Sequence, residues 1–186
     1  MAEPLGLESK TVRLVSYDPR WPTLFRAEAA RLADAVAAAR LPNLIFEHVG
    51  STAVPGLAAK PILDVTAGRR SEIPADVYVP VLEAAGWIYR GNSGLPGREF
   101  FRRGEPRSHH LHLVECGGWH WQRYLGFRDA LRADAALRDA YATLKRELAA
   151  RYPRDREAYI EGKAAFVEAV VRARGVVRDD SSTDAS

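Results

Sequence analysis

The chain has few of the residues that build disulfides, membrane spans or a charged surface of one sign. Cys116 is the single cysteine among 186 residues, so no disulfide can form within the chain. No stretch approaches the roughly 20 consecutive apolar residues that a membrane-spanning helix needs. The 27 Lys and Arg residues nearly balance the 24 Asp and Glu residues. These absences argue against a disulfide-stabilised or membrane-inserted protein and do not favour a dedicated nucleic-acid binder.

What remains is the composition of an ordinary globular domain. Hydrophobic residues make up 47% of the chain and charged residues 27%, which is enough to bury one substantial core. The chain opens with polar residues instead of a basic and then apolar leader, so we expect a reduced, cytoplasmic protein. Patterned sequence extends over residues 12–174. We expect one domain there, with flexible tails at 1–11 and 175–186.

The hydrophobic spacing predicts an α/β (α+β) fold, a mixed sheet flanked by helices with a helical C-terminal portion. Apolar residues recur at helical spacing over 23–39, 77–85 and from 119 onward. We expect breaks near Asp134 and at Tyr152-Pro153, and Asp155 as the cap of the last helix. The glycine-rich loop 91–97 is expected to be mobile. Strands are predicted at 12–15, 44–49, 61–65, 87–90, 99–102 and 110–115.

One turn carries the clearest chemical motif. Gly50 and Ser51 follow a predicted strand and precede Thr52, so backbone N–H groups are free there to bind an anion such as phosphate. Lys60 adds a positive charge, and the next strand presents Asp64, an oxygen ligand suited to Mg²⁺. The alternative is a structural turn, with Asp64 as a cap and Lys60 solvated.

Several cationic side chains are candidates to line the same cleft. They are Arg98, Arg102, Arg128, Arg132, Lys145 and Lys163. Each alone is most often a solvated charge. Arg128 and Arg132 are four residues apart and share a helix face, where a bidentate grip on phosphate or carboxylate is feasible. The aromatic residues around them, at helical spacing, favour a core role over stacking on a base.

The run from Glu47 to Asp64, EHVGSTAVPGLAAKPILD, closely resembles the signature of the GrpB-like family of nucleotidyltransferase-fold proteins. The resemblance extends over 12–174 through further short motifs: Tyr17-Asp18-Pro19-Arg20-Trp21-Pro22, His110-Leu111-His112, Phe127-Arg128-Asp129, Leu131-Arg132, Leu144-Lys145 and Lys163. It implies a minimal nucleotidyltransferase fold related to polymerase-β-like enzymes. Some relatives carry this domain fused to dephospho-CoA kinase, which implies a nucleotide or coenzyme context.

The chain departs from the wider nucleotidyltransferase pattern at its carboxylates. In that pattern a Gly-Ser pair is followed by two carboxylates one residue apart and by a third on a later strand. Here Asp64 matches the first, Thr66 stands at the second position, and residues 110–114 contain no acid. Two-metal phosphoryl transfer needs anionic oxygens to hold both cations, so this departure weakens the two-metal reading.

His110 and His112 offer a replacement, because residues two apart on a strand project from the same face. With Asp64, and with Glu47 or His48 from the neighbouring strand, two imidazoles and a carboxylate suit Zn²⁺, Mn²⁺ or Fe²⁺ better than Mg²⁺. Alternatively, one imidazole is a general base or binds phosphate directly. The third reading is a pair of histidines satisfied by hydrogen bonds within the sheet.

Three functions remain open. The leading one is binding of a nucleoside triphosphate between Gly50-Ser51, Asp64, His110 and His112, with a divalent cation, Mg or Mn, and transfer of a nucleotidyl group to a small molecule or protein. The second is a nucleotide- or phosphometabolite-binding module that does not catalyse transfer, for which Thr66 is the evidence. The third is a metal-dependent enzyme built on the histidines and Asp64.

Overall fold

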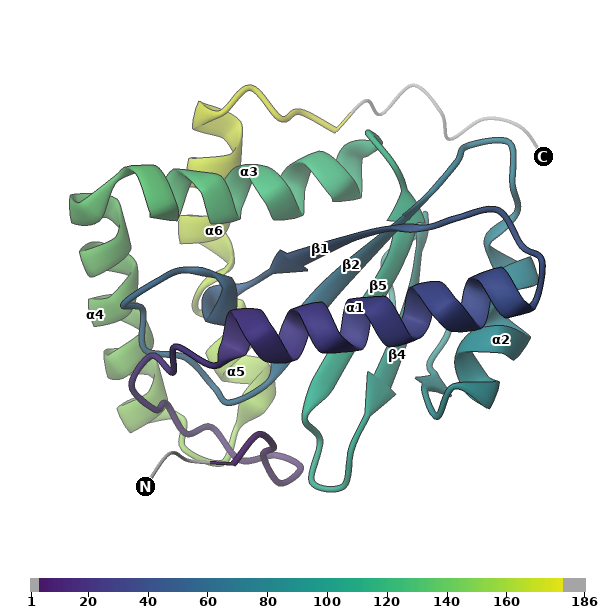
Figure 1. Ribbon diagram of the computed structural model, residues 1–186. Helices are drawn as coiled ribbons and strands as arrows, with labels where there is room; N and C mark the ends of the chain where they lie inside the picture. The colour runs from purple at the N-terminus through teal and green to yellow at the C-terminus, as the bar shows by residue number, and fades with distance from the viewer. Residues whose placement is uncertain (1–3, 179–186) are drawn as a thin grey trace.

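The fold centres on a five-stranded mixed sheet, with strand order β1-β2-β5-β4-β3. The computed structural model describes residues 4–178. The strands are β1 (Ile45–Val49), β2 (Leu63–Arg69), β3 (Ile88–Tyr89), β4 (Arg98–Arg103) and β5 (His109–Glu115). β2 and β5 run parallel, and every other pairing is antiparallel. The expected mixed sheet flanked by helices is confirmed (Figure 1).

The register of the parallel pair decides which side chains share a face. Asp64 lies opposite His110, and Thr66 lies opposite His112. Because side chains alternate along a strand, all four point to one face of the sheet. The alternate residues of β5 and β2, Leu111 among them, point to the other face and are buried there.

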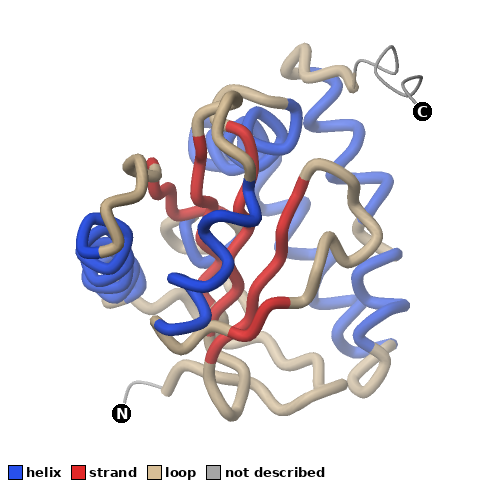
Figure 2. The backbone as a smooth tube through the Cα atoms, turned by 90° about the vertical axis from the view of Figure 1, so that its right-hand side faces the viewer, coloured by secondary structure: helices blue, strands red, loops and turns tan. Residues whose placement is uncertain are grey.

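Helices α1 (Trp21–Ala38) and α2 (Val79–Ala84) cover that apolar face, and Figure 2 shows the strands between these helices and the C-terminal ones. Pro22 lies in the first turn of α1, where its missing N–H is not needed. Leu32 and Val36, one turn apart on α1, pack on Val65 and Leu111 of the sheet. This layer forms the main hydrophobic core.

The opposite face is covered by α3 (Trp119–Ala133), which packs on β1, β2 and β5. It is followed by α4 (Ala135–Arg151), α5 (Arg156–Glu161) and α6 (Ala164–Ala173). Asp134 ends α3 and its carboxylate accepts the Leu137 N–H at 2.9 Å, so it also caps α4. The expected breaks at Asp134 and at Tyr152-Pro153 are both present.

Several boundaries differ from the expectation. The strand expected at 12–15 is reduced to an isolated bridge between Val15 and Ala59, and the Val12 N–H donates to the Pro153 carbonyl instead. The helix expected at 77–85 begins as a 3-10 turn, Ala75–Tyr78, before α2. The last helix is two helices, and Asp155 caps only the first, α5. Gly162 interrupts them against the side chain of Leu148.

The N-terminal segment packs on the sheet layer instead of extending as a tail. The Gly6 N–H donates to the Pro61 carbonyl at 2.8 Å, and Leu7 pairs with Arg107 and is 4% exposed. Of the tails predicted at 1–11 and 175–186, residues 1–3 and 179–186 lie outside the described residues. Within residues 4–178, none of the helices combines the length and apolar composition needed to cross a membrane.

Gly68 on β2 allows α3 to approach the sheet, because a Cβ there would lie 2.5 Å from the Trp121 ring and 3.1 Å from the Cys116 Cβ. We expect Gly68→Ala to lower the free energy of unfolding by about 1–3 kcal/mol through overpacking. Gly126→Ala within α3, where the added methyl is only in ordinary contact with Val176, is the control and should be neutral or stabilising. Urea denaturation measures both; equal stability of the two variants would contradict the close packing.

Candidate functional site

A cavity of about 430 Å³ lies between the polar face of the sheet and the C-terminal helices. The Gly50-Ser51 turn, Asp64 of β2 and the histidines of β5 line one side. Helices α3 to α6 line the other. The cationic and aromatic residues that line it are Lys60, Arg98, Trp119, Arg123, Tyr124, Phe127, Tyr141, Arg156, Tyr159 and Lys163.

The Gly50-Ser51 turn is fitted tightly over Asp64. Gly50 has a φ of 70°, and a Cβ at this position would lie 2.5 Å from the Asp64 Oδ2. Glycine is therefore required both by the backbone conformation and by the space. Ser51 begins a short 3-10 turn, and its Oγ accepts a hydrogen bond from Lys145 Nζ at 3.1 Å. The turn and the lysine thus form one unit at the wall of the cavity.

Asp64, His110 and His112 meet as the sequence predicts. His110 Nδ1 lies 2.8 Å from Asp64 Oδ1, and His112 Nε2 lies 3.9 Å from the same oxygen. Burial raises the pKa of Asp64, but its contacts with the two histidines outweigh burial and hold the pKa below its ordinary value. Burial lowers the pKa of His110, so the imidazole is neutral at pH 7 and donates from Nδ1 to Asp64. Its Nε2 is then an acceptor, buried without a partner.

Two lysines, Lys60 and Lys163, line the cavity, and a third, Lys145, binds Ser51 and the Ala58 carbonyl behind the turn. Burial, reinforced by the charge of Lys163, lowers the pKa of Lys60 to about 7. Burial and the charges of Lys163 and Lys60 lower the pKa of Lys145 to about 7 as well. Burial lowers the pKa of Lys163 to about 8, although Asp64 opposes the shift. Within residues 4–178, none of the three forms an ion pair with a carboxylate, although Asp64 and Glu168 also line the cavity. Lys60, Lys163 and the lining arginines therefore give it an excess of cationic side chains.

The donor set does not fit a two-metal centre. Thr66 carries no charge, is fully buried, and its Oγ1 has no hydrogen-bond partner. Glu47, level with Thr66 on β1, is bound by Arg128. Among residues 4–178, no group of three His, Cys, Asp or Glu side chains is arranged to hold a metal ion. A metal at Asp64, His110 and His112 therefore stays a prediction that needs these side chains to rearrange.

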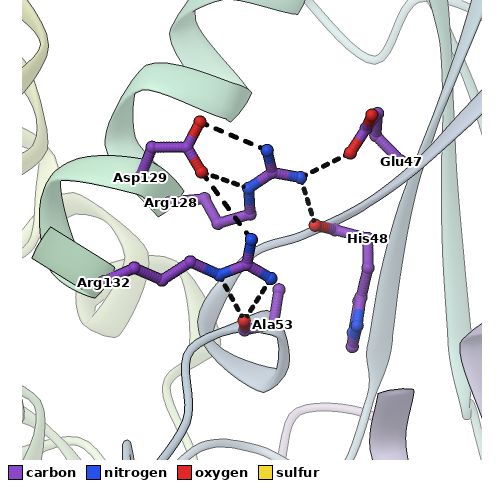
Figure 3. Close-up of polar contacts among 6 residues, drawn as sticks. All are labelled: Glu47, His48, Ala53, Arg128, Asp129 and Arg132. Carbon is purple, nitrogen blue, oxygen red and sulfur yellow. Dashed lines mark hydrogen bonds and ion pairs between the residues drawn. The ribbon is translucent and has the colours of Figure 1, made fainter. Parts of the chain in front are cut away.

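Arg128 and Arg132 do not reach the cavity, contrary to the expectation that they grip phosphate. Arg128 Nη1 donates to Glu47 Oε2 at 2.6 Å and to the His48 carbonyl at 3.0 Å, while its Nε donates to Asp129. Arg132 donates twice to the Ala53 carbonyl (Figure 3). Both guanidinium groups are occupied in holding α3 to β1 and to the turn after Ser51.

The remaining predicted residues divide between the two faces. Arg98 and Lys60 line the cavity as expected, and Arg98 Nη2 also donates to the Asn92 carbonyl at 2.9 Å. The Thr52 hydroxyl lies 3.0 Å from His48 Nε2. His48 itself stacks on Phe25 of α1, on the far side of the sheet, and is not available as a ligand.

Some cavity residues were expected in the core or were not singled out at all. Trp119, Tyr124 and Phe127 line the cavity, and the Tyr124 ring lies tilted against His112 with ring centroids 4.8 Å apart. Tyr141, Tyr159 and Arg156 also face it. The sequence contains one clue to Tyr141. Lys145 follows it by four residues on an otherwise apolar helix face, and a buried cation in such a position needs polar partners nearby.

Removing the Arg128 guanidinium should test its structural role. Arg128→Ala leaves Glu47 and the His48 carbonyl without their donor, and we expect the free energy of unfolding to fall by about 2 kcal/mol or more. Arg138→Ala, which breaks the exposed pair with Asp139, should change it by less than about 1 kcal/mol. Equal effects in denaturant titrations would show that the Arg128 contacts contribute no more than a surface pair.

The lysines predict how stability depends on pH. Their folded pKa values lie below the ordinary 10.5, so between about pH 7 and 10.5 the unfolded chain binds more protons than the folded chain. The contribution of these lysines to the free energy of unfolding therefore rises with pH across that window. Comparing denaturation at pH 7 and pH 9 should show the rise, and Lys60→Met should reduce it. A stability independent of pH in both proteins would contradict the depressed pKa values.

Comparison with known proteins identifies relatives along most of the chain. The family described as GrpB protein matches residues 11–173. The UPF0157 protein of Bacillus subtilis is 35% identical over 161 residues, which cover 86% of this chain and 46% of the relative. The UPF0157 protein of Pseudomonas aeruginosa is 40% identical over 165 residues, covering 86% and 66%. The chain thus spans about half to two thirds of the length of these two relatives.

Other relatives match it along nearly their whole length or only in part. The conserved protein GrpB from Enterococcus faecalis has a similar crystal structure, with a TM-score of 0.78, 33% identity and coverage of 87% of this chain and 96% of that one. A dephospho-CoA kinase of Mycolicibacterium paratuberculosis is 30% identical over 179 residues, 43% of its length. The Cid1 poly(U) polymerase shares the fold at 16% identity and a TM-score of 0.52, covering 73% of this chain and 44% of that one. The chain belongs to the GrpB family and has a nucleotidyltransferase-like fold.

Proposed function

We propose that the protein binds a nucleotide in the 430 Å³ cavity, with the phosphates at the Gly50-Ser51 turn. The observation that carries the proposal is that Lys60 and Lys163 line the cavity without ion-pair partners in the described residues, while Lys145 binds the Ser51 hydroxyl behind the turn. Burying unpaired ammonium groups is costly, and a multiply charged anion offsets that cost by supplying charge and hydrogen-bond acceptors. The Ser51 hydroxyl adds a neutral donor beside the lysines.

A nucleotide fits the rest of the cavity better than a bare anion does. Its volume is within the range of small-molecule sites, and aromatic side chains line much of it. Trp119, Tyr124 and Phe127 provide faces on which a base can stack. The fold is also shared with a poly(U) polymerase whose structure holds MgGTP, which supports the same class of ligand.

The second candidate is nucleotidyl transfer to a small-molecule or protein acceptor, which the His110–Asp64 pair favours. Asp64 holds the Nδ1 proton of His110, which leaves Nε2 as an unpartnered base inside the cavity wall. That nitrogen would take the proton of an acceptor hydroxyl as its oxygen bonds to the α-phosphorus and pyrophosphate leaves. The lysines would stabilise the negative charge on the phosphates. Thr66, in place of a second carboxylate, favours binding without transfer.

Binding is tested by calorimetric titration of ATP, GTP, CTP and UTP into the full chain at pH 7.5. We expect saturable binding accompanied by proton uptake, because an anion raises the pKa of lysines that are partly neutral at this pH. Measurement in two buffers of different ionisation enthalpy gives the proton number. Lys60→Gln and Lys163→Gln should each weaken binding about tenfold. Arg172→Gln on the exposed side of α6 is the charge-matched control. No binding by any of the four nucleotides would refute the proposal.

Transfer is tested separately by pyrophosphate release with Mg²⁺ or Mn²⁺ and a panel of acceptors. Release that is lost in His110→Gln and Asp64→Asn, while nucleotide binding persists, would support transfer. Saturable binding without release in the unmodified protein would support the non-catalytic binding module. A transition metal that copurifies and is lost in His112→Ala would favour the metal-dependent reading instead.

A further inference from the structure

A second cavity, of about 410 Å³, lies beside the first, where three distant segments meet. The N-terminal segment contributes Ser9 and Lys10. Strand β4 and the turn after it contribute Arg102 and Arg107. The start of α5 and the residues before it contribute Arg154 and Arg156. Five of the eight lining residues are therefore cationic, and the other lining residues are Ser9, Asp155 and Glu157.

Arg107 is the centre of this cavity. Arg107 is 7% exposed, and both its Nε and its Nη2 are buried without a hydrogen-bond partner. Arg156 likewise has a buried Nε without a partner. Guanidinium groups are rarely buried without an acceptor, because their N–H groups lose water and gain nothing in return. Arg156 is only partly buried, but its Nε and the two nitrogens of Arg107 are N–H donors at one cavity that an acceptor from outside the chain could satisfy.

The acids at the rim do not neutralise these arginines. The Asp155 carboxylate accepts the Ala158 N–H at 3.0 Å as the cap of α5, and Glu157 is exposed. Within residues 4–178, no ion pair joins either acid to Arg102, Arg107 or Arg156. Burial, together with the charges of Arg156 and Arg102, lowers the pKa of Arg107 to about 10. The cations thus repel one another in the absence of an anion.

We propose that this second cavity binds the phosphate group of a small phosphorylated ligand, separate from the nucleotide. A phosphate offers acceptors in the geometry that guanidinium forks match, and its charge is what five converging cations require. Arg156 lines both cavities, so occupation of one changes the charge that the other experiences. The site therefore suits a phosphorylated acceptor or a regulatory anion. The proposal stands on Arg107 and its neighbours and does not depend on the nucleotide site.

The test is a calorimetric titration of inorganic pyrophosphate into the full chain. We expect two classes of site. Arg102→Gln combined with Arg154→Gln, which alters partly exposed and exposed cations of the second cavity, should weaken one class at least tenfold and spare the other. Lys60→Gln combined with Lys163→Gln should do the reverse. Arg26→Gln with Arg172→Gln, a charge-matched pair on α1 and α6, should leave both classes unchanged. Thermal unfolding establishes that each variant is folded.

Arg107→Lys is the stricter variant, because it keeps the charge and removes the fork. It should weaken only the second class of site, while Tm shows that the chain is folded. Ribose 5-phosphate binding to that class would identify an organic phosphate as the occupant, and binding of pyrophosphate alone would identify a free inorganic one; both support the site. A single class unaffected by the second-cavity variants, or equal loss in the control pair, would overturn the proposal. If the class of site that depends on Lys60 and Lys163 is the one not observed, only the proposed nucleotide site is refuted.

Discussion

The parallel pairing of β2 with β5 is the constraint on which the site depends. It sets Asp64 level with His110, so that carboxylate and imidazole share a hydrogen bond on the face that α3 covers. A shift of one residue in this register would move Asp64 into the hydrophobic core between the sheet and α1. The tight fit of Gly50 over Asp64 depends on the same placement, because β1 and the turn after it pair with β2.

The arginines and lysines near this sheet have opposite roles because their charges are balanced differently. Arg128 is buried, but Glu47, Asp129 and a backbone carbonyl take up its donors, so its contacts hold α3 in place. Lys60 and Lys163 are held over the ring of Tyr159 and find no carboxylate in the part of the chain described. A satisfied buried cation is structural, whereas an unsatisfied one beside a cavity points to an external anion.

The short helix α5 joins the two cavities. Arg156 at its start contributes to the wall of both, and Tyr159, one turn later, lies under Lys60 and Lys163. The Asp155 cap fixes where this helix begins, and Gly162 fixes where it ends against Leu148. The two proposed phosphate sites lie side by side, an arrangement that would suit a reaction between two phosphorylated molecules or regulation of one ligand by the other.

The sequence by itself determined the local elements and the turn that bears Gly50 and Ser51, because hydrophobic spacing, helix caps and glycine geometry are properties of neighbouring residues. It also placed His110 and His112 on one face, since alternation along a strand is local. Only the tertiary structure decided the fate of Arg128 and Arg132: their spacing was read correctly, but their partners come from β1 and the turn after it, about 80 residues earlier in the chain. The same holds for the N-terminal segment, in which Leu7 is buried and pairs through its backbone with Arg107, and for the two cavities. Each is created by side chains distant in sequence, and the packing that unites them leaves no periodic pattern to read.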